Sequence, residues 1–393
     1  MTFRNECTDY CIASIRALLK GNPIPAMPES VSIDELFAFS KYHSMEAMVW
    51  HCLEQQNLNF SDPTVQKWEN RAGMLLVQSM VQLQERESLF AALQSAGIPI
   101  LPVKGCWLKE QYPQIDYRQM SDLDILIHPE DAEKAKAVML AESYRVELFD
   151  DGGNQDDYVK PPYMGVELHR SLLPEEDPSY SYYLDIWERA QLQPGQERLY
   201  RLTPEDEYIY YLLHLYKHLL QAGAGIRLVL DSMVYRRIHK DMDKVYLRRE
   251  YNKLGITTFA EAIEELSDCW FDSGTPIPER LQAMAESLLT AGTYGTESQL
   301  LQNELEPLQK KAGSPLLLKI LYLLRLVFLP LPRMAELYPV LKKAPVLLPL
   351  LWIWRIIARL LFKPKTVITF IKKTNEAGDK VWSKFNWREY RSK

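Results

Sequence analysis

Hydrophobic positions in the first hundred residues recur every three or four residues, which is the period of an α-helix. One amphipathic run opens at Ile33, and a longer one extends from Val65 to about Ala96. The apolar positions of the longer run are Leu75, Leu76, Met80, Leu83, Leu89 and Leu93. Gly97 follows it, as a glycine at a helix end commonly does. The pattern predicts an N-terminal helical region over residues 1–96.

From residue 97 to about residue 200 the pattern changes to short branched apolar runs that alternate with helical stretches. The apolar runs predict buried strands at residues 100–103, 123–127 and 164–168. Helical patterns cover residues 107–112 and 132–143, and a polar loop spans about 150–157. We therefore expect an α+β fold, with a small mixed β-sheet at residues 97–200 flanked by N- and C-terminal helical regions.

Helical periodicity returns after residue 201 and continues toward the end of the chain. Thr203 followed by Pro204 is typical of a helix start, because threonine caps and proline suits the first turn. We divide this part into a helical domain at residues 201–314 and a segment of apolar, basic helices with a tail at residues 315–393.

The C-terminal segment contains two long apolar runs. Each is broken by Lys, Arg or Pro before about 18 uninterrupted apolar residues, so neither predicts a membrane span. Burial against the catalytic unit is the favoured interpretation. The alternative is a basic, apolar surface in peripheral contact with an anionic membrane.

Composition excludes two classes of protein. An apolar content of 47% argues against disorder, and 46 basic against 52 acidic residues, a net charge of −6, argue against a surface devoted wholly to nucleic acid. Five cysteines without a C-x-x-C pair predict reduced thiols, no disulfide partner and a cytoplasmic location. Cys7 and Cys11 share a helical spacing but have no histidine pair nearby, so we expect no zinc site.

The motif Ser-Asp-Leu-Asp at residues 121–124 opens the second predicted strand. Side chains alternate along a strand, so Asp122 and Asp124 share one face. Two carboxylates this close repel each other unless a cation lies between them, and Mg²⁺ prefers oxygen ligands. The pair therefore predicts a metal and phosphate site, although an acidic turn before a strand can produce the same letters.

Other residues near this motif suit phosphate. Lys104 and Gly105 follow the first strand, where a glycine admits backbone amides and a lysine neutralises charge. Arg118 supplies a forked donor. These three residues, together with Ser121, are the candidates for phosphate binding.

A third acid, Glu167, lies inside the third strand-like run, where a charge is unfavourable without a purpose. Period two places Glu167 and His169 on one face. A third carboxylate could hold a second ion or accept the proton of an attacking hydroxyl. The alternative is a surface acid on an edge strand.

These residues support a resemblance in their order along the chain. The motifs LPVKG, YPQIDYR, SDLDILI and VELHRSLL resemble the uncharacterised bacterial nucleotidyltransferases, a family of the DNA polymerase β-like superfamily. Residues His214, Lys217, His218, Arg227 and Asp231 look like its downstream helical portion, and the likeness extends from about Ile33 to Leu361. One departure from the wider superfamily is Lys104-Gly105-Cys106 in place of its usual Gly-Ser.

The resemblance implies transfer of a nucleoside monophosphate from a nucleoside triphosphate to an acceptor, with release of pyrophosphate. It implies that Asp122, Asp124 and Glu167 are catalytic and bind Mg²⁺, two ions in all. The acceptor stays open among a small molecule, a sugar, a protein and an RNA end. The competing hypothesis is an inactive fold kept as a binding or scaffold protein in a polysaccharide or peptide-modification pathway.

Two pairs on the downstream helices have i, i+4 spacing and can each share a face. For His214 and His218 we favour a packing or substrate-side role over a metal site, since the glutamate of an H-E-x-x-H motif is missing. Arg227 and Asp231 suggest an intrahelical ion pair, with base or ribose recognition as the alternative.

Overall fold

The computed structural model describes residues 5–56, 58–221, 223–293, 301, 305, 308–309, 312–362, 372–374 and 387–391. They form two compact units. The first comprises residues 1–216, 225–293 and 388–393, and the second comprises residues 217–224 and 294–387. The four regions expected from the sequence stay a prediction.

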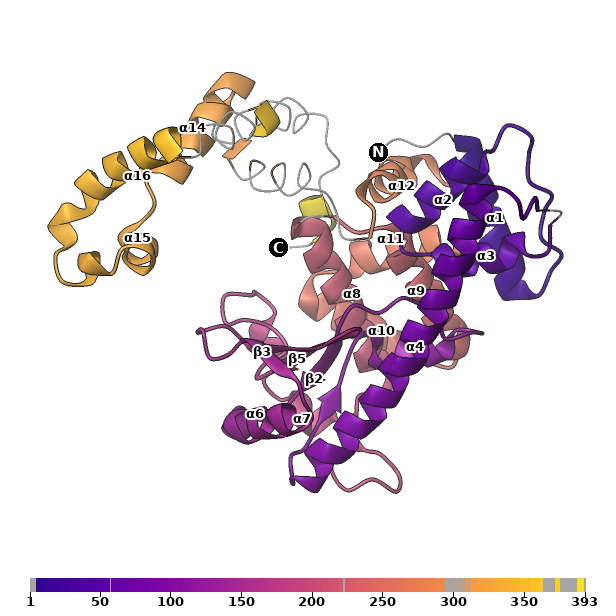
Figure 1. The fold of residues 1–393 in the computed structure, drawn as a ribbon, viewed down its shortest axis with the longest axis horizontal. Coiled ribbons are helices and arrows are strands. Elements are labelled where there is room, and N and C mark those ends of the chain that lie inside the picture. Colours follow the sequence, from indigo (N-terminus) through magenta and orange to yellow (C-terminus); the bar gives the residue numbers. More distant parts are fainter. Residues whose placement is uncertain are drawn as a thin grey trace. The chain divides into compact units, whose positions relative to one another are not determined.

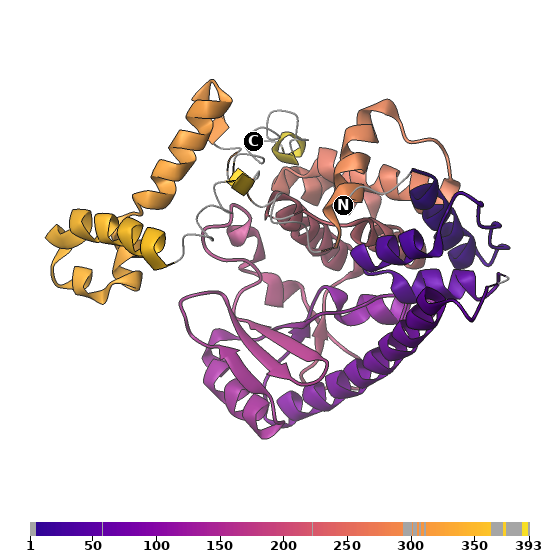
Figure 2. The ribbon, with the colours of Figure 1, turned by 45° about the horizontal axis from the view of Figure 1, so that its top comes forward.

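The N-terminal region is helical, as predicted. Its four helices are α1 (Asn5–Lys20), α2 (Ile33–Tyr42), α3 (Glu46–Leu53) and α4 (Pro63–Ser95). α4 begins where the Asp62 carboxylate accepts the Thr64 amide proton at 2.7 Å, which satisfies a free donor of the first turn. Figure 2 shows α4 passing from the N-terminal helices to the β-sheet. α4 therefore connects the N-terminal helices of the first unit with its β-sheet.

The first unit contains a five-stranded mixed sheet, which lies toward the α6 end of the unit (Figure 1). Its strands are β1 (Leu101–Pro102), β2 (Leu123–Leu126), β3 (Arg145–Leu148), β4 (Gln155–Lys160) and β5 (Met164–His169). They lie in the order β1-β2-β5-β4-β3, in which β2 and β5 are parallel and the other pairs antiparallel. The predicted α+β class with a small mixed sheet is confirmed.

One face of the sheet is covered by α4 and by α6 (Ala132–Ala141). Leu123 and Ile125 of β2 and Val166 and Leu168 of β5 point into this apolar core. Because side chains alternate across a strand, the residues between them project from the other face. That second face carries the polar positions of β2 and β5.

The remaining elements of the first unit are mostly helices. They are α5 (Gly105–Leu108), α7 (Ile186–Arg189), α8 (Pro204–Gln221), α9 (Ile226–Ile238), α10 (Lys244–Leu254), α11 (Thr257–Asp268) and α12 (Glu279–Ala291), with a two-stranded pair β6 (Gln191–Leu192) and β7 (Tyr200–Arg201). α8 runs on into the second unit. Its predicted start is confirmed, since the Thr203 hydroxyl accepts the Asp206 amide proton at 3.2 Å.

The second unit contains α14 (Pro315–Val327), α15 (Leu331–Leu337) and α16 (Leu348–Phe362). Leu318 and Tyr322 of α14 are buried against Leu301 and Leu305. No helix in the described part of the chain combines the length and apolarity needed to cross a membrane.

Two details of the sequence prediction are wrong. Strands β3 and β4 were not expected, and part of β4 falls in the predicted loop. β4 escaped detection because its inward positions include Asp156, a buried acid that accepts a hydrogen bond from Arg170 at 3.1 Å. On α4, Leu76 and Met80 are exposed, whereas polar side chains turn inward between the apolar ones; these are Ser79, Gln82 and Arg86.

Candidate active site

Two carboxylates meet on the face of the sheet opposite to α4 and α6. β2 and β5 pair in parallel with Asp124 opposite Glu167, so both side chains leave the sheet side by side. Asp124 is buried, with 4% of its surface exposed, and Glu167 is half-buried. The expectation that the acid of the third strand joins the aspartate of the second is met in the geometry.

Lys104 bridges these two carboxylates. Its Nζ donates a hydrogen bond to Asp124 Oδ1 and lies 3.9 Å from Glu167 Oε2. Burial alone would lower the pKa of Lys104, but Asp124, together with Tyr210 and Glu167, outweighs burial and raises it. The residue is thus a fixed cation between the two acids.

The backbone at Lys104 is unusual. Its φ of +54° and ψ of −123° lie in a region that side-chain-bearing residues rarely adopt. Such conformations cost energy and gather at functional sites, where the surrounding structure enforces them. Here the turn between β1 and α5 directs the ammonium onto Asp124.

His169, at the end of β5, completes the group. Its Nε2 lies 2.8 Å from Asp124 Oδ1 and 3.4 Å from Glu167 Oε2. Its Nδ1 is buried and has no hydrogen-bond partner among the described residues. Burial lowers the pKa of His169, whereas Asp124 and Glu167 raise it by more. His169 therefore orients the Asp124 carboxylate.

Asp124 is held ionised. Burial raises the pKa of this carboxyl group, but Lys104 and His169, with a smaller effect from His214 on α8, bring it well below its usual range. The same oxygen, Oδ1, accepts from both Lys104 and His169. The charge is therefore available at every physiological pH.

Asp122 lies at the edge of this cluster. It is half-buried, and its Oδ1 accepts a hydrogen bond from the Ser121 hydroxyl at 2.9 Å. Burial is the largest cause that raises the pKa of Asp122, and the charges of Asp124 and Glu167 raise it further. Asp122 therefore lies close enough to both acids for electrostatic repulsion. Gly165 on β5 permits this approach, because a Cβ there would lie 3.2 Å from the Ser121 carbonyl oxygen.

The donor set fits a divalent cation. Asp124, Glu167 and His169 each offer one ligand atom, and these atoms lie within 4.8 Å of one another. Two carboxylates suit Mg²⁺ or Mn²⁺. The Lys104 ammonium lies between them, which shows that the electrostatic potential at this position favours a cation. The sequence predicted Asp122, Asp124 and Glu167 as the metal ligands. The compact set shares Asp124 and Glu167 with this prediction and contains His169 in place of Asp122.

The structure gives Arg118 a partner other than phosphate. Its guanidinium is buried and donates from Nε to both oxygens of Asp231 on α9, at 3.1 and 3.2 Å. The Tyr112 hydroxyl donates to the same carboxylate at 2.6 Å. Gly105 is required here because a Cβ would lie 2.5 Å from Arg118 Nη1. Arg118 and Gly105 thus fix the turn that carries Lys104, and the expected contact of Arg118 with phosphate stays a prediction.

Arg227 and Asp231 are paired less closely than expected. Arg227 Nη1 lies 3.9 Å from Asp231 Oδ2 and donates to the Gln119 carbonyl at 3.0 Å. The shorter contacts of Asp231 come from Arg118 and Tyr112, so the predicted intrahelical pair is a secondary contact.

A buried lysine escaped sequence analysis. Lys109 is 1% exposed and donates to the Arg118 carbonyl at 3.0 Å and to Gln82 Oε1 at 3.3 Å. Burial, together with Arg118 and Arg227, lowers its pKa to about 7. The sequence offered no signal, because a lysine in a short helix is ordinarily solvated.

The two histidines of α8 have different surroundings. His214 lies close enough to lower the pKa of Asp124. His218 follows one turn later on α8 and belongs to the second unit. Their predicted packing or substrate-side role stays a prediction.

Residues 29–272, more than half of the chain, match the family described as uncharacterised nucleotidyltransferase. The chain belongs to this family. The family match includes every residue of the cluster, from Lys104 to His169, and ends before α12. The protein is accordingly a nucleotidyltransferase, an enzyme of the transferase class.

A solved structure that is similar to part of the chain is the solution structure of the antibiotic-resistance factor ANT(2'')-Ia. The identity is 12%, and the similarity covers 44% of this chain and 93% of that chain, with a TM-score of 0.33. No curated protein matches the chain.

Proposed function

We propose that the protein transfers a nucleoside monophosphate from a nucleoside triphosphate to an acceptor hydroxyl or similar nucleophile. The acceptor oxygen bonds to the α-phosphorus while the bond to the β-phosphate oxygen breaks, and pyrophosphate leaves. The observation that carries this proposal is the side-by-side placement of Asp124 and Glu167 with Lys104 between them. Family membership supplies the reaction class.

Asp122, Asp124 and Glu167 would hold Mg²⁺, two ions in all. Bound Mg²⁺ supplies charge neutralisation on the phosphates and lowers the pKa of the acceptor hydroxyl. His169 keeps Asp124 oriented. Lys104 supplies a further positive charge beside the phosphates, and Glu167, the more exposed of the paired acids, is placed to take the acceptor proton.

The acceptor is proposed only by class, as a small molecule, a sugar, a protein hydroxyl or an RNA end. The cytoplasm is the proposed location, since nucleoside triphosphates are there and the five cysteines form no disulfide bond.

A thermal-shift panel tests the nucleotide site. The four ribonucleoside triphosphates are added to the full chain with and without Mg²⁺, because a ligand that binds the native state raises its Tm. At least one triphosphate should raise the Tm only in the presence of Mg²⁺. Asp124→Asn and Glu167→Gln should abolish this shift while circular dichroism stays unchanged.

Glu130→Gln is the matched control. Glu130 is an exposed acid in the turn after β2, outside the cluster, and its variant should keep the full shift. If no triphosphate shifts the Tm, or if Asp124→Asn and Glu167→Gln keep the wild-type shift, the proposed site is refuted. Binding without pyrophosphate release for any acceptor class would instead support the scaffold hypothesis.

A further inference from the structure

The helices of the second unit expose an unusual amount of apolar surface. We call residues 315–362, with α14, α15 and α16, the C-terminal helical segment. Of the 26 large apolar side chains that are exposed in the described chain, 15 lie in this segment. Of the other 11, four lie together on α4 and seven are distributed over the rest. Contiguous exposed apolar surface marks an interaction site. These side chains are exposed within the second unit, and the burial against the catalytic unit that the sequence pattern favoured stays a prediction.

α14 is apolar on two opposite faces. Leu318 and Tyr322 are buried in the small core of the second unit. Leu316, Ile320 and Leu324 follow one another at intervals of four and are 70%, 44% and 46% exposed. A helix that is apolar all round needs a second apolar environment besides its own core.

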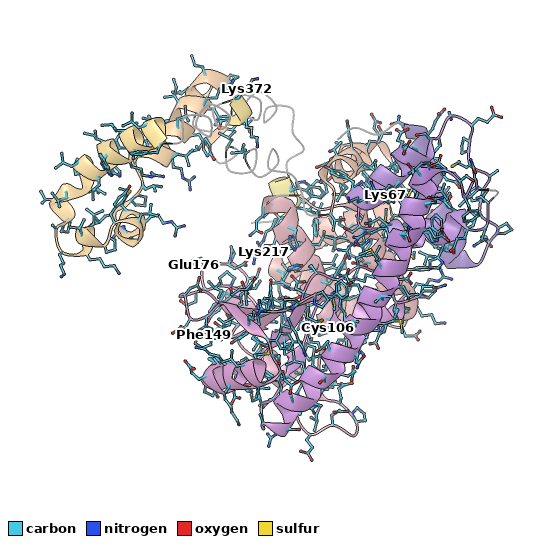
Figure 3. All side chains as sticks on the ribbon, in the orientation of Figure 1. Lys67, Cys106, Phe149, Glu176, Lys217 and Lys372 are labelled. Carbon is cyan, nitrogen blue, oxygen red and sulfur yellow. The ribbon has the colours of Figure 1, made fainter. Side chains whose placement is uncertain are left out.

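α16 repeats this arrangement. One side of α16 is hydrogen-bonded to α14 and to the residues that follow it. Arg355 donates to the Leu326 carbonyl of α14 at 2.8 Å, and Trp352 donates to the Leu329 carbonyl, just after α14, at 3.0 Å. Its outer face is one apolar stripe with helical spacing, formed by Leu350, Ile353, Trp354, Ile357 and Leu361, all exposed. Figure 3 shows side chains projecting from the outer sides of these helices.

The charge of the segment is opposite to that of the whole chain. It contains seven basic residues and one acidic residue, Glu336, hence a net charge of +6 in a chain of net charge −6. The basic residues are Lys319, Arg325, Arg333, Lys342, Lys343, Arg355 and Arg359. Arg325, Lys342 and Lys343 have exposed side chains. Apolar stripes combined with basic residues are the pattern of helices that lie in the interface of an anionic bilayer.

The lengths of the helices exclude a spanning role for them. α14 has 13 residues and α16 has 15, whereas a span needs about 20. Two tryptophans, Trp352 and Trp354, suit the headgroup level. A second copy of the chain is a poorer occupant, because it would bring two segments of charge +6 together. The exposed apolar residues elsewhere in the described chain are fewer, 11 against 15.

We propose that the C-terminal helical segment is a membrane-surface anchor that binds anionic phospholipid bilayers in the plane of the interface. The outer stripes of α14 and α16 insert among the acyl chains, and the exposed basic side chains contact the lipid phosphates. The anchor lies outside the residues that match the nucleotidyltransferase family, so it adds a location to the enzyme rather than a chemical step.

Vesicle flotation with the full chain tests the anchor. Vesicles of phosphatidylcholine alone are compared with vesicles containing about one third phosphatidylglycerol. The wild type should float with the anionic vesicles, and binding should weaken steeply as salt is raised. The double variant Ile353→Glu, Ile357→Glu and the double variant Lys342→Glu, Lys343→Glu should each reduce the bound fraction at least tenfold.

The matched control is the double variant Val77→Glu, Met80→Glu. These residues are also exposed, 52% and 58%, but lie on α4. This control should bind vesicles as the wild type does, and circular dichroism should show all variants folded. The proposal is overturned if the wild type does not float, if it binds neutral and anionic vesicles equally, or if light scattering shows a dimer that the Ile353→Glu, Ile357→Glu variant dissolves while no vesicle binding occurs.

Discussion

Replacing Lys104 by methionine tests whether its ammonium and a divalent cation compete for the same carboxylates. Lys104 Nζ lies 3.9 Å from Glu167 Oε2 and is hydrogen-bonded to Asp124. At that distance two opposite charges attract by about 4 kcal/mol for an effective dielectric constant near 20. An ion that binds both carboxylates must displace the ammonium. If the ammonium moves to twice its present distance from the carboxylates, it keeps about half of the attraction to them. The wild type therefore gives up about 2 kcal/mol when it binds the ion.

The expected result is tighter metal binding by the variant. A difference of about 2 kcal/mol corresponds to roughly a 30-fold lower Kd. Isothermal titration calorimetry with Mn²⁺ measures this value directly, without any need to know the acceptor. In the metal-free state, the free energy of unfolding of the Lys104→Met variant should fall, because two buried or half-buried acids lose their cation.

Lys104→Arg is the control, since it keeps the charge and should bind Mn²⁺ within a fewfold of the wild type. The competition is refuted if a folded Lys104→Met variant binds Mn²⁺ no more tightly than the wild type. Weaker binding by the variant would show that the ammonium supports the site instead of occupying it.

Three further substitutions test the scaffold around the site. Asp231→Asn should lower the free energy of unfolding in urea by about 3–5 kcal/mol, because Arg118 loses its buried counter-charge; a loss below about 1 kcal/mol contradicts this. Burial lowers the pKa of His43 to about 3, so the unfolded chain takes up the proton first, near pH 6.5, and stability falls with pH below that value. The free energy of unfolding should drop by about 2 kcal/mol more from pH 7 to pH 5 in the wild type than in His43→Asn, and equal drops would contradict the assignment. Gly225→Ala should cost about 1–3 kcal/mol or more in the same urea assay, because its Cβ would lie 2.8 Å from His43 Nδ1 and from backbone atoms; an unchanged midpoint would show that the backbone yields there.

The pairing of Asp124 with Glu167 could be expected from sequence because it depends on local patterns. Each acid interrupts a run of branched apolar residues, and period two fixes the face on which it lies. The parallel register that brings them together spans 43 positions of the chain, so the pattern could suggest the pairing but only the structure could establish it. For the same reason the sequence predicts that His169 shares a face with Glu167, whereas the contact of His169 with Asp124 becomes visible only in the structure.

The polar interior was the least predictable part. Gln82 was assigned to no role, yet its amide donates to the Met120 carbonyl at 2.9 Å and to the Tyr163 carbonyl at 3.0 Å. These partners lie 38 and 81 positions away in sequence. A polar residue on a helix suggests solvent unless its partners are known, and no local period reports such partners.

These buried polar contacts make the helical regions part of the catalytic core. Arg86 of α4 donates to the Cys106 carbonyl at 2.7 Å, directly after the Lys104-Gly105 turn. From the opposite part of the chain, Asp231 of α9 holds Arg118 against Gly105. The strained turn at Lys104 is therefore held by charged groups from both flanking regions, and residues 97–200 by themselves would leave Arg118 without its counter-charge. It follows that residues 97–200, although they contain every acid of the cluster, form a working site only within the whole first unit.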